Sequence, residues 1–279
     1  MKKINKLPVS SLLCYGYLAI LVCIAAFPLF WIFISSIKQP GEIISSISFI
    51  PQNPGLHYYI KIFTEMNFQQ NLMNSLVTAV GTTAIALLVA SHASYGIVRY
   101  FNNGRKGRVM TRMLITTYMF PSILLAIPYS VLIGKIGLQN SRLGLILTYL
   151  SFSIPFAVWM LIGFFRTVPM EIEESAMVDG ASPLKTFYLI ALPIVAPGVA
   201  ATGIYTFINA WNEVLFALIL TNSTSKMTAP VYMSSLIGAE ILDWGVMMAS
   251  SMVFVLPSLF FFMLIQKKIA GGLTQGAIK

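Results

Sequence analysis

The chain has 279 residues, of which 57% are hydrophobic and 10% are charged, and its formal net charge is +9. This composition excludes an ordinary soluble domain, because such domains are about 25% charged. The basic excess does not indicate nucleic-acid binding, because the charges flank long apolar runs. Those runs predict transmembrane helices, since about 20 apolar residues cross the roughly 30 Å of bilayer hydrocarbon.

Six apolar segments follow one another along the chain. The first begins after a lysine-rich start and is too long for a signal-peptide core, so it is interpreted as a retained anchor. A polar stretch with a short helix near residues 58–66 follows it, and a polar loop at 221–243 precedes the last segment. Prolines 121 and 128 should kink the third span and Pro155 should break the fourth. We predict one all-α transmembrane domain, residues 1–279, with spans at about 11–35, 72–98, 113–133, 143–165, 198–220 and 244–265.

The distribution of basic residues predicts the orientation of these spans. With the N-terminus inside, the inner segments hold 13 of the 18 Lys and Arg residues and the outer loops hold five. Positive charge favours the cytoplasmic side, so both termini and the tail at 266–279 are expected there. The densest basic loop, residues 99–112, is interpreted as topology charge in contact with anionic lipid, with docking to a partner as the alternative.

The segment 169–193, between the fourth and fifth spans, holds four of the nine acidic residues. Pro169 suits a helix start, and acids in the first turns favour the positive end of a helix. Gly180 can end this helix in a left-handed conformation. Ser182 and Pro183 suit the N-cap and first position of a second helix. Because four carboxylates cannot lie in hydrocarbon, the segment should protrude from the membrane.

The second helix of this segment should carry one apolar face. Leu184, Phe187, Tyr188 and Ala191 recur at helical spacing, and Pro193 should close the helix. A stiff pair of helices with an apolar face and fixed charges suits docking into a partner protein. The alternative is a helix lying on lipid, which the carboxylates oppose on an anionic inner leaflet.

No set of residues points to catalysis or to a metal. The sequence has no G-x-x-x-x-G-K-[ST] phosphate loop, so any ATP must bind another chain. Cys14 and Cys23 fall on one predicted helix and cannot bridge each other. His57 and His92 have no metal-ligating partner at motif spacing, so loop and packing roles are expected for them.

Glu213 is the carboxylate that falls inside a predicted span, with Asn209 and Asn212 near it in sequence. These residues either form a polar wall or gate of a solute pathway or make helix–helix hydrogen bonds and reach outer water. Both alternatives stay open. Asn74, near the outer end of the second span, is expected to be structural.

The segment 169–193 resembles the signature of ABC importer permease subunits, which is Glu-Ala-Ala, three residues, Gly, and later Ile-x-Leu-Pro. Here the pattern occurs as Glu174-Ser175-Ala176, three residues, Gly180, and Ile190-Ala191-Leu192-Pro193, with Ser in place of the first Ala. The extension Asp179-Gly180-Ala181-Ser182 resembles the carbohydrate-uptake branch. The tail 272–279 resembles the terminal motif of the maltose-type second permease subunit.

This resemblance implies a permease subunit of the bacterial inner membrane that forms half of an alternating-access pathway for a mono- or oligosaccharide. Its implied partners are a homologous second permease, a nucleotide-binding ATPase dimer and an extracytoplasmic solute-binding protein. ATP and Mg²⁺ would bind the ATPase, so this chain would hold no cofactor and would not be an enzyme. The runner-up is an importer of another solute, such as a phosphodiester or a polyamine. A stand-alone secondary carrier or channel is the hypothesis from a different class.

The resemblance also implies site residues. Ten are expected to couple the chain to the ATPase: Glu173, Glu174, Ser175, Ala176, Asp179, Gly180, Leu184, Phe187, Tyr188 and Pro193. Gly272, Thr274, Gln275 and Gly276 are expected to contact the ATPase from the tail, with a frayed terminus as the alternative.

Overall fold

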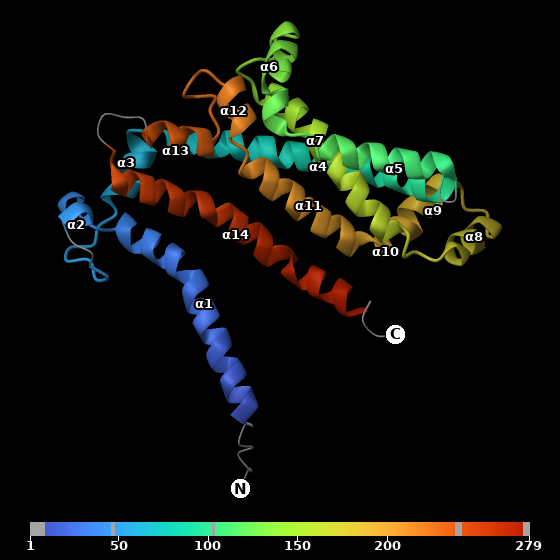
Figure 1. Ribbon diagram of the computed structural model, residues 1–279, viewed down its shortest axis with the longest axis horizontal. Coiled ribbons are helices and arrows are strands. Elements are labelled where there is room, and N and C mark those ends of the chain that lie inside the picture. Colours follow the sequence, from blue (N-terminus) through green and yellow to red (C-terminus); the bar gives the residue numbers. More distant parts are fainter. Residues whose placement is uncertain (1–8, 46–47, 102–103, 238–241, 276–279) are drawn as a thin grey trace. The chain divides into compact units, whose positions relative to one another are not determined.

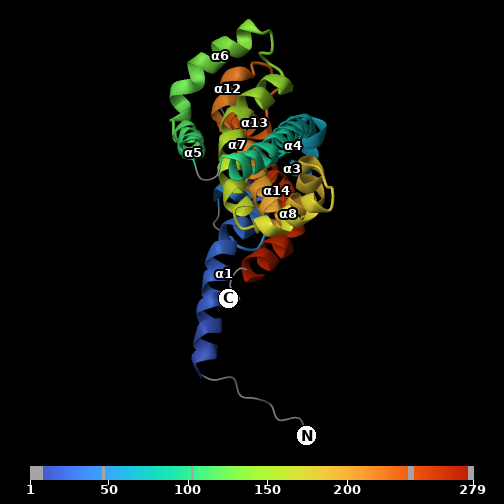
Figure 2. The same cartoon turned by 90° about the vertical axis from the view of Figure 1, so that its right-hand side faces the viewer.

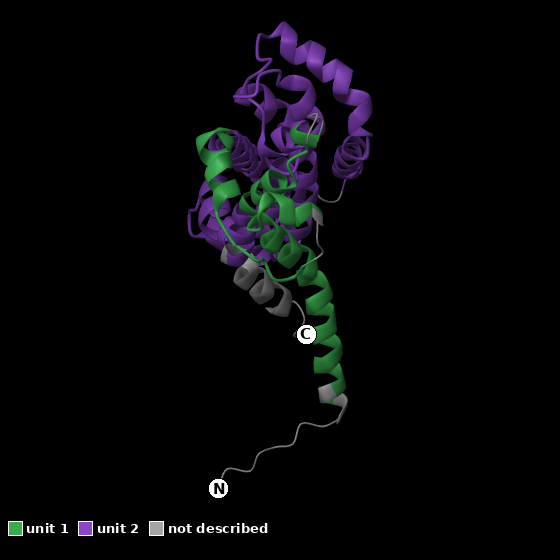
Figure 3. Ribbon diagram, turned by 90° about the vertical axis from the view of Figure 1, so that its left-hand side faces the viewer, with its two compact units in different colours: residues 1–68, 236–255 green, residues 69–235, 256–279 purple. Residues whose placement is uncertain are grey.

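The computed structural model describes residues 9–45, 48–101, 104–237 and 242–275, with side chains described up to residue 263. All regular structure in these ranges is helical. The chain divides into two compact units (Figure 3). Unit 1 is residues 1–68 with 236–255, and unit 2 is residues 69–235 with 256–279.

Unit 1 contains α1 (Val9–Ser36), α2 (Pro40–Ser45), α3 (His57–Thr64) and the first part of α14 (Trp244–Gln275). Most side chains of α1 between residues 13 and 30 are both apolar and exposed. An apolar helix surface of this extent requires lipid or protein cover. The helix α1 corresponds to the predicted first span, and α3 corresponds to the predicted short helix near residues 58–66.

Contacts between α3 and the start of α14 organise unit 1. The Tyr58 ring lies so close to Gly245 that an added Cβ there would collide with it. Lys61 Nζ and Asp243 Oδ2 form an ion pair at 2.8 Å, and Asp243 Oδ1 accepts from the Val246 amide at the start of α14. Burial, with a smaller contribution from the Asp243 charge, raises the pKa of Tyr58 to about 12, so its phenol stays neutral.

Unit 2 contains all of α4 (Phe68–Tyr100) except its first residue. It continues with α5, a 3₁₀ turn and two further helices. These are α5 (Arg105–Tyr118), η1 (Ser122–Leu125), α6 (Ala126–Lys135) and α7 (Arg142–Phe165). Six short elements and one longer helix follow: α8 (Met170–Val178), α9 (Pro183–Thr186), the π-helical η2 (Phe187–Ala191), α10 (Leu192–Ile194), α11 (Ala196–Trp211), α12 (Leu215–Leu220) and α13 (Ala229–Ile237). Within this unit α5 and α11 both pack on α7, and α12 contacts α6 (Figures 1 and 2).

Among the residues that the structure describes, four helical stretches are long and apolar enough to cross a membrane by themselves: Leu13–Ser36, Phe68–Tyr100, Arg142–Phe165 and Trp244–Met263. They correspond to the predicted spans 11–35, 72–98, 143–165 and 244–265. Counting each of two bent helix pairs as one span raises the number of candidates to six.

The other two predicted spans are interrupted. The kink predicted at Pro121 in the span 113–133 is confirmed and is larger than a simple kink, because α5 ends at Tyr118 and the helical direction changes by 84° before Ser122–Lys135. Pro121 lies in this break with extended backbone, and it has no N–H to continue the helix. The span predicted at 198–220 is likewise divided, into α11 and α12, at residues 212–214.

Two smaller predictions are also wrong. Pro155 does not break the fourth span, because α7 runs through it. A proline removes one backbone hydrogen bond, and the packed neighbours of a buried helix can hold the remaining turns in place. The segment 221–243 is not only a loop, since it contains the whole of α13, whose mixed sequence hides its helical character.

A buried amide joins three segments of unit 2. Asn74 Nδ2 donates to the carbonyls of Ser225 (2.9 Å) and Met227 (2.8 Å), and its Oδ1 accepts from Arg142 Nε at 2.8 Å. Asn74 is fully buried, so the structural role predicted for it is confirmed.

Asn74→Ala should destabilise the protein by about 3 kcal/mol, because buried groups of its partners lose their hydrogen bonds. The thermal unfolding midpoint in detergent measures this. Asn222→Ala is the matched control, since Asn222 is an exposed amide outside the Asn74 hydrogen bonds, and exposed changes usually cost below about 0.5 kcal/mol. Equal midpoints for the two variants would contradict the structural role.

Candidate functional site

The segment 169–193 forms two short helices joined by a tight turn. Pro169 precedes α8, and Gly180 ends it with a φ of +86°, a conformation that glycine adopts without strain. Ser182 Oγ accepts from the Lys185 amide at 3.4 Å, with Pro183 in the first turn of α9. The helix boundaries predicted at Gly180, Ser182 and Pro183 are therefore confirmed.

Pro193 does not close the second helix, because helical backbone continues to Ile194 before a 75° bend into α11. The preceding turn is π-helical, with the Leu192 amide bonded to the Phe187 carbonyl. This wider turn fits Pro193, which has no N–H to offer the carbonyl four residues earlier.

One carboxylate of α8 is buried and holds the element to α4. Glu173 is 1% exposed. Its Oε2 accepts from the Tyr95 hydroxyl at 2.8 Å, and its two oxygens accept from Arg99 Nε at 2.9 and 3.0 Å. An Arg99 terminal nitrogen also donates to the Val168 carbonyl at 3.0 Å. These are charge-assisted hydrogen bonds in a buried position, where they are strongest.

This ion pair corrects two expectations. Arg99 is not merely a charge of the basic loop, since it binds Glu173 inside the protein. Glu173 is not on the surface, so it cannot meet a partner as an exposed acid would. No local pattern indicates the pair, because its members are 74 residues apart and Arg99 has the ordinary position of a topology charge at a span end.

The predicted apolar face of the second helix is split between core and surface. Phe187 and Ala191 are buried, and the Phe187 ring lies 4.9 Å from that of Tyr95. Leu184 is 65% exposed and Tyr188 is 48% exposed. The expectation of a single face is wrong because helical spacing assumes 3.6 residues per turn, whereas the π-helical turn begins at Phe187.

His92 provides a second link between α4 and this element. Its Nδ1 lies 2.7 Å from the Leu88 carbonyl and its Nε2 lies 2.7 Å from the Tyr188 hydroxyl. Because a carbonyl only accepts, Nδ1 carries the hydrogen, and in the neutral ring Nε2 accepts from Tyr188. The ring also lies 4.8 Å from Phe187, so the packing role predicted for His92 is confirmed.

The remaining side chains of the element define an exposed surface, which we name the docking patch. Val178 is 87% exposed, and the exposed Ser175 hydroxyl donates to the Glu171 carbonyl. Ala176 is half-buried. The apolar members of the patch are Met177, Val178, Leu184, Tyr188 and Leu189, and the acidic ones are Glu171, Glu174 and Asp179.

A cavity of about 360 Å³ lies where the two interrupted segments of unit 2 come together. Asn209 and Glu213 line it, and Asn212 does not. The Glu213 oxygens accept from the amides of Phe216 (2.8 Å) and Ala217 (3.1 Å), so this carboxylate caps α12 within its own segment. Glu213 also interacts with Tyr149 of α7, so contact with a second helix and a place in the polar wall of the cavity both stay open for it.

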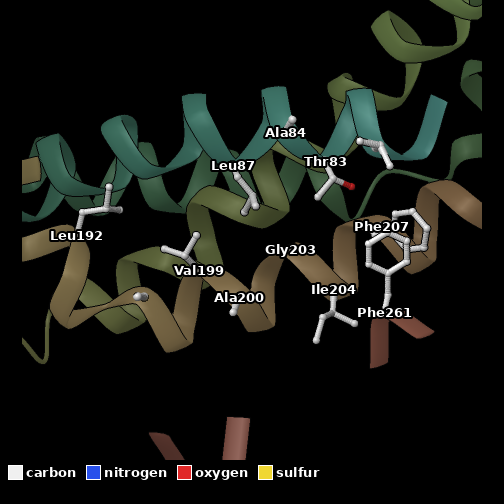
Figure 4. Close-up of a pocket in the computed structure, with 12 residues that line it drawn as sticks. Thr83, Ala84, Leu87, Leu192, Val199, Ala200, Gly203, Ile204, Phe207 and Phe261 are labelled. Carbon is white, nitrogen blue, oxygen red and sulfur yellow. The ribbon is translucent and has the colours of Figure 1, made fainter. Parts of the chain in front are cut away.

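A groove of about 440 Å³ between α4 and α11 has a different character (Figure 4). Its walls are apolar, with side chains such as Leu87, Ile204 and Phe207. The Thr83 hydroxyl already donates to the Ala79 carbonyl at 2.7 Å. This groove therefore offers a polar solute almost no hydrogen-bonding groups.

Of the expected tail contacts, Gly272, Thr274 and Gln275 lie in the helical backbone of α14. Their side chains, and Gly276 altogether, lie outside the described residues. Within the described part of the chain, no three His, Cys, Asp or Glu residues come together as a metal site would require.

Residues 96–275, which include Arg99, the docking patch and the cavity, match the family described as binding-protein-dependent transport system inner membrane component. The chain is 35% identical over 278 residues to the inner membrane ABC transporter permease protein YcjP of Escherichia coli, and the match covers 99% of each chain. It is 35% identical over 257 residues to the trehalose transport system permease protein SugB of Mycobacterium tuberculosis, covering 91% of this chain and 93% of that protein.

The fold is similar to a chain in the crystal structure of a bacterial ABC transporter involved in the import of the acidic polysaccharide alginate. The TM-score is 0.76, with 93% of this chain and 96% of that chain covered. The sequence identity is 20%, so this likeness concerns the fold alone.

Arg99→Met should destabilise the protein by about 3–5 kcal/mol, because it leaves the Glu173 charge buried without a partner. The double variant Arg99→Met with Glu173→Met should recover most of this loss, since no buried charge is left. Thermal unfolding of the four proteins of this cycle measures the effect.

Arg105→Met is the control, because Arg105 is exposed at the start of α5. The importance of the buried pair would be refuted if Arg99→Met were no less stable than Arg105→Met. It would also be refuted if the loss of stability in the double variant equalled the sum of the losses in the two single variants.

Proposed function

Since this chain belongs to the family of binding-protein-dependent transport system inner membrane components, we propose that it forms half of the translocation pathway of an ATP-driven carbohydrate importer. The observation that carries this proposal is the docking patch, an exposed apolar and acidic surface on an element held rigidly by Arg99 and Glu173. Such an element suits transmission of force from a separate motor protein.

The proposed partner at the docking patch is a nucleotide-binding ATPase dimer. Exposed apolar side chains such as Val178 and Leu184 fill a cleft on the partner, and the acidic residues Glu174 and Asp179 fix the orientation. Glu173 and Phe187 face inward, so their role is to hold the element on α4. ATP and Mg²⁺ bind the ATPase, because this sequence has no phosphate-binding loop.

The proposed arrangement has six spans with both termini in the cytoplasm. The third span is formed by α5 with α6 and the fifth by α11 with α12, and the docking element lies between the fourth and fifth. The excess of Lys and Arg in the segments that this arrangement places inside supports it. In this proposal a homologous second permease completes the pathway. A solute-binding protein delivers the solute from outside, which the binding-protein dependence in the family description supports.

A carbohydrate is the proposed solute. Support comes from the sequence of the 169–193 segment and from relatives named for sugar uptake, among them the trehalose permease of Mycobacterium tuberculosis. Tail contacts with the ATPase through Gly272, Thr274, Gln275 and Gly276 belong to the same proposal. An importer of a phosphodiester or a polyamine is the alternative.

Glu174→Lys and Gly180→Val should abolish carbohydrate uptake driven by ATP while the protein still inserts in the membrane. The first reverses a charge of the docking patch, and the second strains a turn that requires positive φ. Uptake into proteoliposomes that contain the full transporter and the solute-binding protein measures this, together with the ATP hydrolysed per solute imported.

Glu65→Lys provides the matched control, because Glu65 is an exposed glutamate distant in sequence from the patch. Full coupling in the Glu174→Lys transporter would count against the proposed docking surface. Carbohydrate uptake by this chain without an ATPase would overturn the importer itself.

Single cysteines should report the proposed orientation. In a Cys14→Ala, Cys23→Ala background, Val178→Cys should react with a membrane-impermeant maleimide only after the cytoplasmic side is opened. Lys226→Cys, which is also exposed, should react from outside in intact cells. The reverse labelling pattern would refute the orientation.

A further inference from the structure

Two apolar segments of unit 2 are interrupted at the same cavity. The breaks lie at residues 119–121 and 212–214. Non-helical backbone within a membrane is tolerated only where it is buried in protein or lines a water-filled cavity. Phe120 and Ser122 beside the first break, and Glu213 and Phe216 at the second, all line the cavity of about 360 Å³. In transporters, interrupted spans are typical positions of solute-binding sites.

Aromatic rings form one side of this region. The rings of Phe156 and Tyr205 stack with centroids 4.1 Å apart, and the Tyr118 and Tyr205 hydroxyls are 3.1 Å apart. Tyr118 and Tyr205 are each 40% exposed, so parts of their faces are open to a ligand. A smaller cavity lined by these rings and by Asn209 lies beside the first, and both share Tyr118, Phe152 and Asn209.

The polar groups here are neutral with one exception. Asn209 Nδ2 donates to the Tyr205 carbonyl at 2.8 Å, which leaves a second N–H and the amide oxygen for a ligand. Ser151 and Ser153 add hydroxyls, and Glu213 is the sole ionisable acid or base among the lining residues other than tyrosine. No lysine or arginine lines the cavity, so a negatively charged ligand would meet a carboxylate with no basic partner.

We propose that this chain itself binds a neutral sugar ring in the cavity, an inference that rests on the proposed carbohydrate importer and adds a binding site to it. Tyr118 lines this cavity and Tyr205 lines the smaller one beside it, so the two offer aromatic faces and hydroxyls where the cavities adjoin. Asn209 lines both and offers a donor and an acceptor to sugar hydroxyls. A volume of about 360 Å³ lies within the range of ligand pockets, which are mostly apolar and aromatic with a few placed polar groups. The Glu213 carboxylate disfavours uronic acids, so the site discriminates between neutral and acidic sugars.

The test measures sugar binding to the whole membrane complex in nanodiscs without the solute-binding protein, so that only the membrane site contributes. The probes are radiolabelled trehalose, maltose and a uronic-acid disaccharide. The wild-type complex should bind a neutral disaccharide more tightly than the acidic one. Asn209→Ala and Tyr205→Leu should each raise the Kd at least about fivefold, and Tyr205→Phe, which keeps the ring, should raise it less.

Asn212→Ala is the matched control. Asn212 lies one turn further along, is exposed, and also donates its Nδ2 to the carbonyl four residues earlier, at 2.9 Å, but it does not line the cavity. Its Kd should equal that of the wild type. Co-purification of the second permease should be unchanged in Asn209→Ala, and basal ATPase activity should be unchanged in the control Asn212→Ala.

The outcomes separate this inference from the proposed function. Wild-type uptake of a neutral disaccharide with no binding to the complex, or with equal Kd values for Asn209→Ala and Asn212→Ala, would overturn the site and leave the importer intact. Loss of the second permease in Asn209→Ala would identify the cavity as a subunit interface and would also overturn the site. ATP-driven uptake of another solute, and of no carbohydrate, would overturn both proposals.

Discussion

The ion pair between Arg99 and Glu173 is the interaction on which the rest of this structure depends. A carboxylate and a guanidinium buried together are costly to separate, because each would be left without a partner in a low dielectric. The pair therefore fixes the first turn of α8 to the last turn of α4, a helix of 33 residues and about 50 Å. A displacement of α8 would therefore be transmitted to α4 through this contact, whereas a flexible loop would absorb it.

Within the second helix of the 169–193 segment, the residues that pack into the core differ from those exposed at the surface. Phe187 and Ala191 turn into the core while Leu184 and Tyr188 stay at the surface, and the π-helical turn separates the two groups. His92 touches both sides of this division, since its ring lies against Phe187 and its Nε2 accepts from Tyr188. A buried residue of this segment, such as Phe187, therefore sets the position of the exposed residues without itself lying at the surface.

Local features of the fold were predictable from the sequence. Gly180, Ser182 and Pro183 act on adjacent backbone, so their effects follow from neighbouring residues alone. The four continuous spans follow from composition in the same way. The features that were not predictable depend on distant contacts or on small conformational differences. Arg99 and Glu173 meet only after folding, and the break at 212–214 lies inside an apolar run that hydropathy cannot divide. Pro121 did indicate a kink in the third span, but not the 84° size of the bend. The Glu213 cap did have a local signal, a carboxylate three residues before an amide that it could accept from.

The helix α11 joins the two sites. It begins directly after the 75° bend that follows the docking element, and it ends at Trp211, immediately before the break that the cavity surrounds. Its 16 residues span about 24 Å. Its side facing α7 is closely packed, since the Phe164 ring lies where a Cβ on Gly198 would be. Close packing permits few intermediate positions, so we expect a displacement of the proposed docking element to move α11 as a body. Asn209 and the residues around Glu213 lie at its far end, so such a displacement would shift them relative to a solute in the proposed sugar site.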